Sequence, residues 1–162
     1  MSIKNKLEKC FKEGETEKER HQGLRKIKID QERINNHLIK AEHNLSSTIY
    51  LKKGGFSDWS ASAAFYTLYH CLLALIAKYG YESRNQKCTF ALTEDLIEKG
   101  KIKNIDIYDL EEIFDRSVDE DMEHSDKILD IRERMQYSTL TEMEDKEFNR
   151  LFERTNELFD KI

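Results

Sequence analysis

The hexapeptide from Arg132 to Tyr137 places an arginine and a tyrosine five residues apart, and both side chains suit phosphate chemistry. An arginine guanidinium stays charged and can bind two phosphate oxygens at once. A tyrosine phenol, with a typical pKa of about 10, is a poor base at pH 7 but can donate a hydrogen bond to a phosphate. We therefore take Arg132 and Tyr137 as candidate residues of a site that acts on a phosphate group.

His70 is the second candidate for acid–base chemistry, because histidine titrates near neutral pH. It follows Tyr66 by four residues on a predicted helix, so the two side chains share one face, which we expect to border the groove of Arg132. The alternative is that His70 is a hydrogen-bonded core residue and Tyr66 a packing aromatic. Arg134 is a further binding candidate, and its alternative is an ion pair with Asp130, four residues earlier.

The spacing of Arg132 and Tyr137 limits how they can act together. Five residues along a continuous helix turn by about 140°, so the two side chains would point in different directions. They could share one target if the helix ended between them, or if two copies of the chain met across a two-fold axis. The alternative for Arg132 is a structural ion pair with a carboxylate.

The remaining histidines show no grouping typical of metal ligands: His21, His37, His43 and His124. His124 lies among Asp121, Glu123 and Asp126, but no second histidine is near it in the sequence. A zinc site generally needs several such ligands at short spacing. We predict neither a metal site nor a cofactor.

The composition predicts one helical domain. The chain has 162 residues, no proline and six glycines, and 36% of its residues are charged. Proline and glycine disfavour helix interiors, so their scarcity favours helices. The net charge is −5, but residues 1–53 carry 13 Lys or Arg against 8 Asp or Glu. A polyanion would therefore prefer the first third, while the acidic stretch 106–130 suits solvent or a basic partner.

The three cysteines, Cys10, Cys71 and Cys88, are an odd number without metal-type spacing. A reduced, cytoplasmic setting is the simplest account of them. The longest apolar stretch is interrupted by polar residues, and the N-terminus is rich in Lys and Glu. We expect no membrane span and no signal peptide.

Apolar residues at helical spacing predict a helix over residues 27–51, which ends at Gly54 and Gly55. Residues 58–79 are apolar on most of their circumference, which predicts the central buried helix. Further helices are expected over 89–99, over 106–134, and after a capping box of Thr141 and Glu144, with connections at 80–87 and 100–105.

No strand-like alternation appears, so we predict an all-α fold. The expected architecture is an antiparallel up-and-down bundle of four to five helices over residues 31–162. Residues 1–30 form a charged N-terminal helical extension.

Three stretches resemble the HEPN superfamily, in particular a branch of small uncharacterised proteins. Ser60 to Cys71 is similar to the branch's central helix, with small residues, the aromatic pair Phe65–Tyr66 and then His70. Ala41 to Leu45 followed by Gly54-Gly55-Phe56 resembles the preceding helix and its Gly-aromatic step. Ile131 to Tyr137 resembles the closing Leu-Arg-x-x-x-Asp-Tyr, with Gln in place of Asp. The resemblance covers about residues 36–160.

The resemblance implies a homodimer with the arginine motif near the dimer groove. Active members cut RNA without metal, using Arg, four to six residues and then His, and many are toxins paired with a minimal nucleotidyltransferase antitoxin. Here Tyr137 stands at the histidine position, and Thr139 stands where the toxins that are silenced by nucleotide transfer have their modified tyrosine.

Two functions therefore stay open. The first is a toxin-type, metal-independent endoribonuclease that uses Arg132 with Tyr137 or His70, and binding residues Tyr66 and Arg134. The second is a catalytically silent HEPN dimer that binds a nucleotidyltransferase partner or a nucleotide. A helical scaffold without either function is the plainest alternative.

Overall fold

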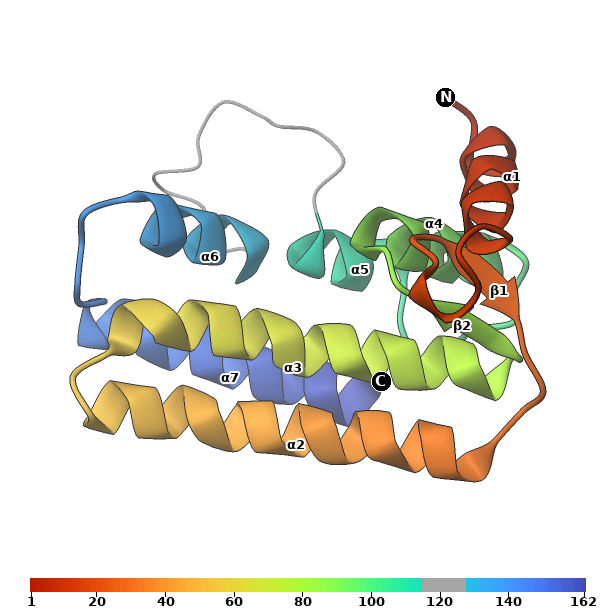
Figure 1. Ribbon diagram of the computed structural model, residues 1–162. Helices are drawn as coiled ribbons and strands as arrows, with labels where there is room; N and C mark the ends of the chain where they lie inside the picture. Colours follow the sequence, from red (N-terminus) through yellow and green to blue (C-terminus); the bar gives the residue numbers. More distant parts are fainter. Residues whose placement is uncertain (115–127) are drawn as a thin grey trace.

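The computed structural model describes residues 1–114 and 128–162, and these form a helical bundle (Figure 1). Its elements in chain order are α1 (Ile3–Gly14), the short 3-10 helix η1 (Lys18–Arg20), β1 (Leu24–Lys26), α2 (Gln31–Lys53), α3 (Ser57–Lys78), β2 (Tyr81–Ser83), α4 (Gln86–Glu98), α5 (Ile107–Ile113), α6 (Ile128–Tyr137) and α7 (Asp145–Lys161).

Four helices run alternately up and down: α2, α3, α6 and α7 (Figure 1). The central one is α3, which packs against each of the other three. The predicted all-α antiparallel bundle is confirmed.

The interior of the bundle follows from small residues on α3. Ala61 and Ala64 are fully buried, and the hydroxyl of Ser60 donates a 2.9 Å hydrogen bond to the carbonyl of Thr48 on α2. Short side chains at these positions let the two helices approach closely. By length and composition α3 could also span a membrane, but 72% of its apolar window is buried, as in the core helix of a bundle.

The helix predicted over residues 106–134 is not continuous. It begins at Ile107, after the capping box of Asp106 and Asp109, and ends at Ile113. Phe114 then adopts an extended backbone, and its ring stacks on Phe90 with the centroids 4.2 Å apart. We attribute the early end of the helix to the packing of this aromatic pair, which the helical spacing of apolar residues does not reveal. The centre of the predicted acidic stretch, residues 115–127 with His124, lies outside the described residues.

The capping box predicted before α7 does not form. The helix begins at Asp145, and Glu144 precedes it without a side-chain capping bond. The segment is instead held by a tertiary contact, because the backbone N–H of Met143 donates to the hydroxyl of Ser57 over 2.7 Å. That bond joins the approach to α7 to the first residue of α3.

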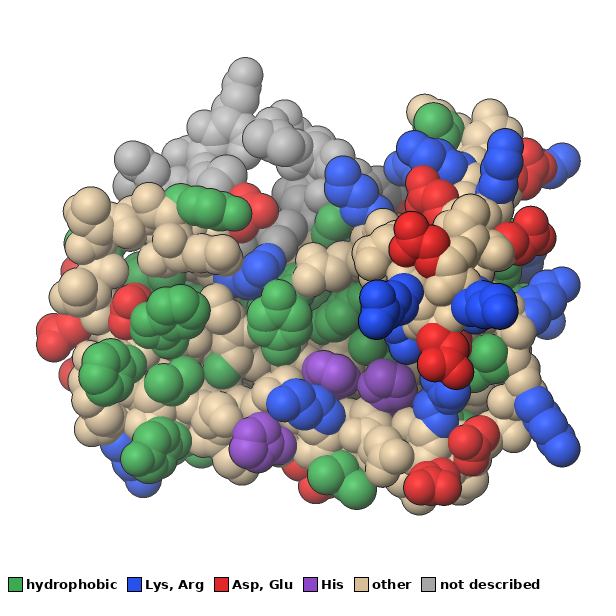
Figure 2. Space-filling view, in the orientation of Figure 1, with side chains coloured by type: hydrophobic (Ala, Val, Ile, Leu, Met, Phe, Trp, Pro, Cys, Tyr) green, Lys and Arg blue, Asp and Glu red, His purple; other side chains and the backbone are tan. Residues whose placement is uncertain are grey.

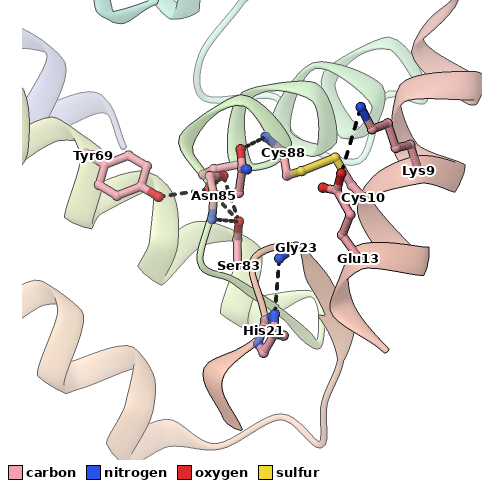
Figure 3. Close-up of a disulfide and its surroundings, with 10 residues drawn as sticks. Lys9, Cys10, Glu13, His21, Gly23, Tyr69, Ser83, Asn85 and Cys88 are labelled. Carbon is pink, nitrogen blue, oxygen red and sulfur yellow. Dashed lines mark hydrogen bonds and ion pairs between the residues drawn. A yellow bond between two sulfur atoms is a disulfide. The ribbon is translucent and has the colours of Figure 1, made fainter. Parts of the chain in front are cut away.

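The prediction of reduced cysteines was wrong for two of the three. Cys10 on α1 forms a disulfide with Cys88 on α4, 78 positions later (Figure 3). Cys71 is free and buried. Spacing in the sequence could not reveal a pair so far apart. Since no finding tests the compartment, a cytoplasmic location remains a prediction.

A small sheet was also missed. β1 pairs antiparallel with β2, with Arg25 opposite Glu82. Only β2 lies inside the connection predicted over residues 80–87. Each strand has three residues, which is too short for an alternating pattern to stand out. Together with the disulfide, the sheet attaches the first thirty residues to the end of α3 and to α4. The division into residues 1–30 and 31–162 stays a prediction.

Candidate functional site

His37 on α2 and His70 on α3 form a side-chain pair that the sequence did not predict. Their Nδ1 atoms lie 3.2 Å apart, within hydrogen-bonding distance, and both side chains are partly buried. The rings are 5.4 Å apart between centroids and tilted by 36°. His37 was considered from the sequence only as a metal ligand, and this contact does not make it one because it involves two residues. His70 shares a groove with Tyr66, as their spacing of four residues predicts.

Both imidazoles are held in the neutral form near pH 7. Burial, with the charges of His37 and Lys40, lowers the pKa of His70 to about 4. Burial and Arg33 lower the pKa of His37, and the carboxylate of Glu82 opposes this shift. One neutral ring can donate its Nδ1 proton to the other. A neutral imidazole has an unprotonated nitrogen that can accept a proton from a bound hydroxyl group, and the lowered pKa makes His70 a weaker base than an ordinary histidine.

His70, but not His37, lines an open groove between the two helices, which we call the α2–α3 groove. It has a volume of about 480 Å³ and is lined by Lys40, Asn44, Leu51, Trp59, Ser62, Ala63, Tyr66 and His70. Figure 2 shows histidine side chains together with basic and hydrophobic ones on the face formed by α2 and α3. No carboxylate belongs to the described lining, so the groove suits an anionic ligand better than a cation.

Arg132 projects from α6 onto the aromatic residues of α3. Its Cζ lies 4.3 Å from the ring centroid of Phe65 and 5.5 Å from that of Tyr66. A guanidinium on aromatic faces gains electrostatic attraction and loses side-chain freedom. Its Nε is buried and has no hydrogen-bond partner among the described residues. Because Tyr66 also lines the α2–α3 groove, it connects Arg132 with the side of α3 that carries His70.

Arg132 is not part of the lining of the α2–α3 groove, but it lines a second, larger cavity. It has a volume of about 840 Å³ between α1, α4, α5 and α6, and its lining includes Lys9, Glu13, Lys87 and Glu111. The charges around it are of both signs. Tyr66 and His70 line the α2–α3 groove and not this cavity, so we place the candidate site at the α2–α3 groove.

Tyr137 is not brought to Arg132. Helix α6 continues from Ile128 to Tyr137 without a break, so the two side chains are about 140° apart around its axis. Tyr137 is 79% exposed. The condition that would let both residues of one chain face one target, a helix end between them, is not met.

Arg134 has a structural contact. Its guanidinium forms an ion pair with Glu147 of α7, and both side chains are largely buried. The pair joins α6 to α7, an inter-helix contact that the sequence did not suggest. This role resembles the structural alternative, although the partner is on another helix.

The described residues contain no group of three or more His, Cys, Asp or Glu that could hold a metal ion. The candidate residues are instead two neutral imidazoles in contact, a guanidinium and aromatic rings. Those groups are the ones that proton transfer and phosphate binding require.

A signal for the missed pairing does exist in the chain. Two helices joined by a short turn run antiparallel, so residues equally distant from the turn lie opposite one another. His37 is 17 residues before Gly54, and His70 is 15 residues after Gly55. Comparing positions across the predicted turn, rather than along each helix, would have placed the two histidines together.

Comparison with known proteins indicates the family of the chain. A family model described as "HEPN domain" matches residues 34–162, which is most of the chain. No curated protein and no solved structure matches.

Proposed function

The chain belongs to the HEPN domain family, and from that premise we propose that it is a metal-independent endoribonuclease acting at the α2–α3 groove. The observation that carries the proposal is the 3.2 Å contact between His37 and His70. The family motif has a histidine where this chain has Tyr137. The paired imidazoles of α2 and α3 supply the proton-transfer group that the motif lacks.

The chemistry assigned to the pair is transfer of the 2′-hydroxyl proton. Neutral His70 accepts that proton as the 2′ oxygen attacks the adjacent phosphorus and the bond from phosphorus to the 5′ oxygen breaks. The protonated pair then returns the proton to the leaving 5′ oxygen. The products are a 2′,3′-cyclic phosphate and a free 5′-hydroxyl, and no metal or oxidant takes part.

Arg132 is the cation assigned to the crowded phosphate. Its contacts with Phe65 and Tyr66 restrict the guanidinium, and a restricted group loses less entropy when it binds. Planar guanidinium groups can bind two phosphate oxygens at once. Tyr66 contributes to the binding surface. Arg134 forms an ion pair with Glu147, so we assign it no contact with the RNA in this proposal.

The biological setting that fits this activity is a toxin–antitoxin pair. In that setting the chain is the toxin, it forms a homodimer, and a minimal nucleotidyltransferase is its antitoxin. Light scattering of the purified protein checks the dimer. Co-expression with a nucleotidyltransferase encoded beside it checks the antitoxin, since rescue of growth is the expected outcome.

The direct test uses end-labelled cellular RNA in the presence of a chelator. Wild type should cleave it, and His70→Ala, His37→Ala and Arg132→Ala should each lose at least about a hundredfold in rate, the usual contribution of a general acid or base. His43→Ala is the matched control, because His43 is an exposed histidine on α2 outside the groove lining. Full activity in both His37→Ala and His70→Ala would exclude this mechanism.

The second candidate function is a catalytically silent HEPN dimer that binds a nucleotidyltransferase or a nucleotide. It is favoured by the exposure of Tyr137, which leaves the motif without a proton-transfer group at its own position. With a net charge of −5, the expected protein partner is basic and its complex is weakened by salt. No cleavage by wild type, together with cleavage by Tyr137→His, would favour this function.

A further inference from the structure

We infer that the α2–α3 groove binds an unpaired base of single-stranded RNA, stacked on the rings of Trp59 and Tyr66 beside His70. The inference rests on the proposed ribonuclease function and assigns to it a class of substrate and a subsite. The two rings are seven residues apart on α3, which brings them to the same face of the helix two turns apart.

Both aromatic rings are exposed to solvent, so a ligand can reach them. Trp59 is 60% exposed and Tyr66 is 37% exposed, although both line a groove. Phe65, next to Tyr66, is fully buried, so the two exposed rings lie on a different side of α3 from the core. Base faces stack on exposed aromatic rings in proteins that bind single strands, and this stacking tolerates any sequence.

The polar groups of the groove also suit a nucleotide. Lys40 is the one charged residue of the described lining, so a phosphate in the groove meets positive charge there. Arg132 contacts the Tyr66 ring from outside the lining. This local charge contrasts with the net charge of −5 for the chain. The amide of Asn44 offers both a donor and an acceptor, which suits the edge of an unpaired base.

The accessible bases are those of single strands, because bases in a duplex are stacked on one another and their faces are covered. A base seated in the groove would place its own ribose and phosphate next to His70, which lies one helical turn after Tyr66. The subsite therefore selects unpaired RNA and positions the bond that the histidine pair is proposed to cleave.

The chain contains a natural reporter for this test, because Trp59 is its single tryptophan. Purified full-length protein is titrated with an eight-nucleotide 2′-O-methyl RNA, whose blocked 2′ oxygen prevents cleavage. Quenching of Trp59 fluorescence is expected with the single strand and not with the same sequence as a duplex. In parallel, the fluorescence anisotropy of a labelled copy of the single strand gives the dissociation constant.

Two variants make the test specific. Trp59→Leu should raise the dissociation constant about tenfold, the effect typical of losing one base–aromatic contact. Tyr50→Leu should leave it unchanged, since Tyr50 is an aromatic residue 77% exposed on α2 and outside the groove lining. Circular dichroism of both variants confirms that they are folded.

The outcomes separate this inference from the ribonuclease proposal. Cleavage of natural RNA with no change in Trp59 emission, or with equal affinity in Trp59→Leu, overturns the subsite and leaves the ribonuclease. Quenching by the single strand without cleavage supports the subsite and overturns the ribonuclease. A change in Trp59 emission on concentrating the protein alone, with no response to RNA, shows that a second copy covers the groove and overturns the subsite.

Discussion

His37 and His70 are 33 positions apart in the chain, yet their Nδ1 atoms lie 3.2 Å apart across two antiparallel helices. Such a contact between two like groups requires that at least one ring be neutral, because two protonated imidazoles would repel each other. The pair is therefore a structural contact and, at the same time, a group able to accept a proton. Its protonation state links the stability of the bundle to the proposed chemistry.

Acidification should weaken the fold through this pair. The pKa of His70 in the folded protein is about 4, below the ordinary value of 6.5, so the unfolded chain binds the proton more readily between these values. The free energy of unfolding therefore falls as the pH falls from 6.5 to 4, and this contribution is constant above 6.5. Thermal unfolding at several pH values should show that His70→Asn has a shallower loss of Tm than wild type.

Carboxylates with a lowered pKa also make the free energy of unfolding fall in acid, so wild type has to be compared with a variant. The hydrogen bond from Lys52 lowers the pKa of Asp145, for example, and that contribution is also lost in acid. His43→Asn, at an exposed position of α2, is the matched control and should keep the wild-type slope. An unchanged slope in His70→Asn would contradict the prediction.

Arg132→Ala should lower the free energy of unfolding by about 0.5–2 kcal/mol, because the cation leaves the faces of Phe65 and Tyr66. Urea denaturation measures the change. A double-mutant cycle with Tyr66→Leu isolates the part due to the Tyr66 ring. Arg20→Ala, an exposed arginine on η1, should change stability by less than about 0.5 kcal/mol. Additive effects in the cycle would contradict the contact with Tyr66.

Removal of the disulfide with the variant Cys10→Ser/Cys88→Ser should cost about 2–4 kcal/mol of stability, since the bond closes a long loop in the unfolded chain. Its presence is checked first by alkylating the unreduced, denatured protein. One modified thiol, from Cys71, is expected before reduction and three after it. Three modified thiols before reduction would show that the pair is not oxidised in the sample.

Gly23→Ala should destabilise the protein by about 1–3 kcal/mol through overpacking. A Cβ atom at this position would lie 2.1 Å from the carbonyl oxygen of Cys10 and 2.5 Å from the amide nitrogen of Gly14. Both are backbone atoms, so no side chain can move aside. Gly54→Ala is the control, because its nearest neighbours lie at 3.3 Å or more. Equal stability of the two variants would argue against the close approach of α1 to the segment before β1.

The helical character of the chain was predictable because it depends on residues close in sequence. Scarce glycine, absent proline and the nearly continuous apolar stretch around Phe65 predicted the central helix α3, and the match to a known family agrees with that interpretation. The same local rules failed at Phe114, where a contact with Phe90 ends the helix early. They failed again before α7, which begins at Asp145 without the expected Thr141–Glu144 capping box, while Met143 bonds to Ser57 of α3.

Sequence alone identified His70, Tyr66 and Arg132 as residues able to do chemistry, because residue type sets the charge and the proton affinity of a side chain. The tertiary structure decided which of them meet. It joined His70 to His37, placed Arg132 on Tyr66 and left Tyr137 exposed. It also joined Cys10 to Cys88. These pairings depend on distances between residues far apart in the chain, and such distances follow from the packing of whole helices rather than from any local pattern.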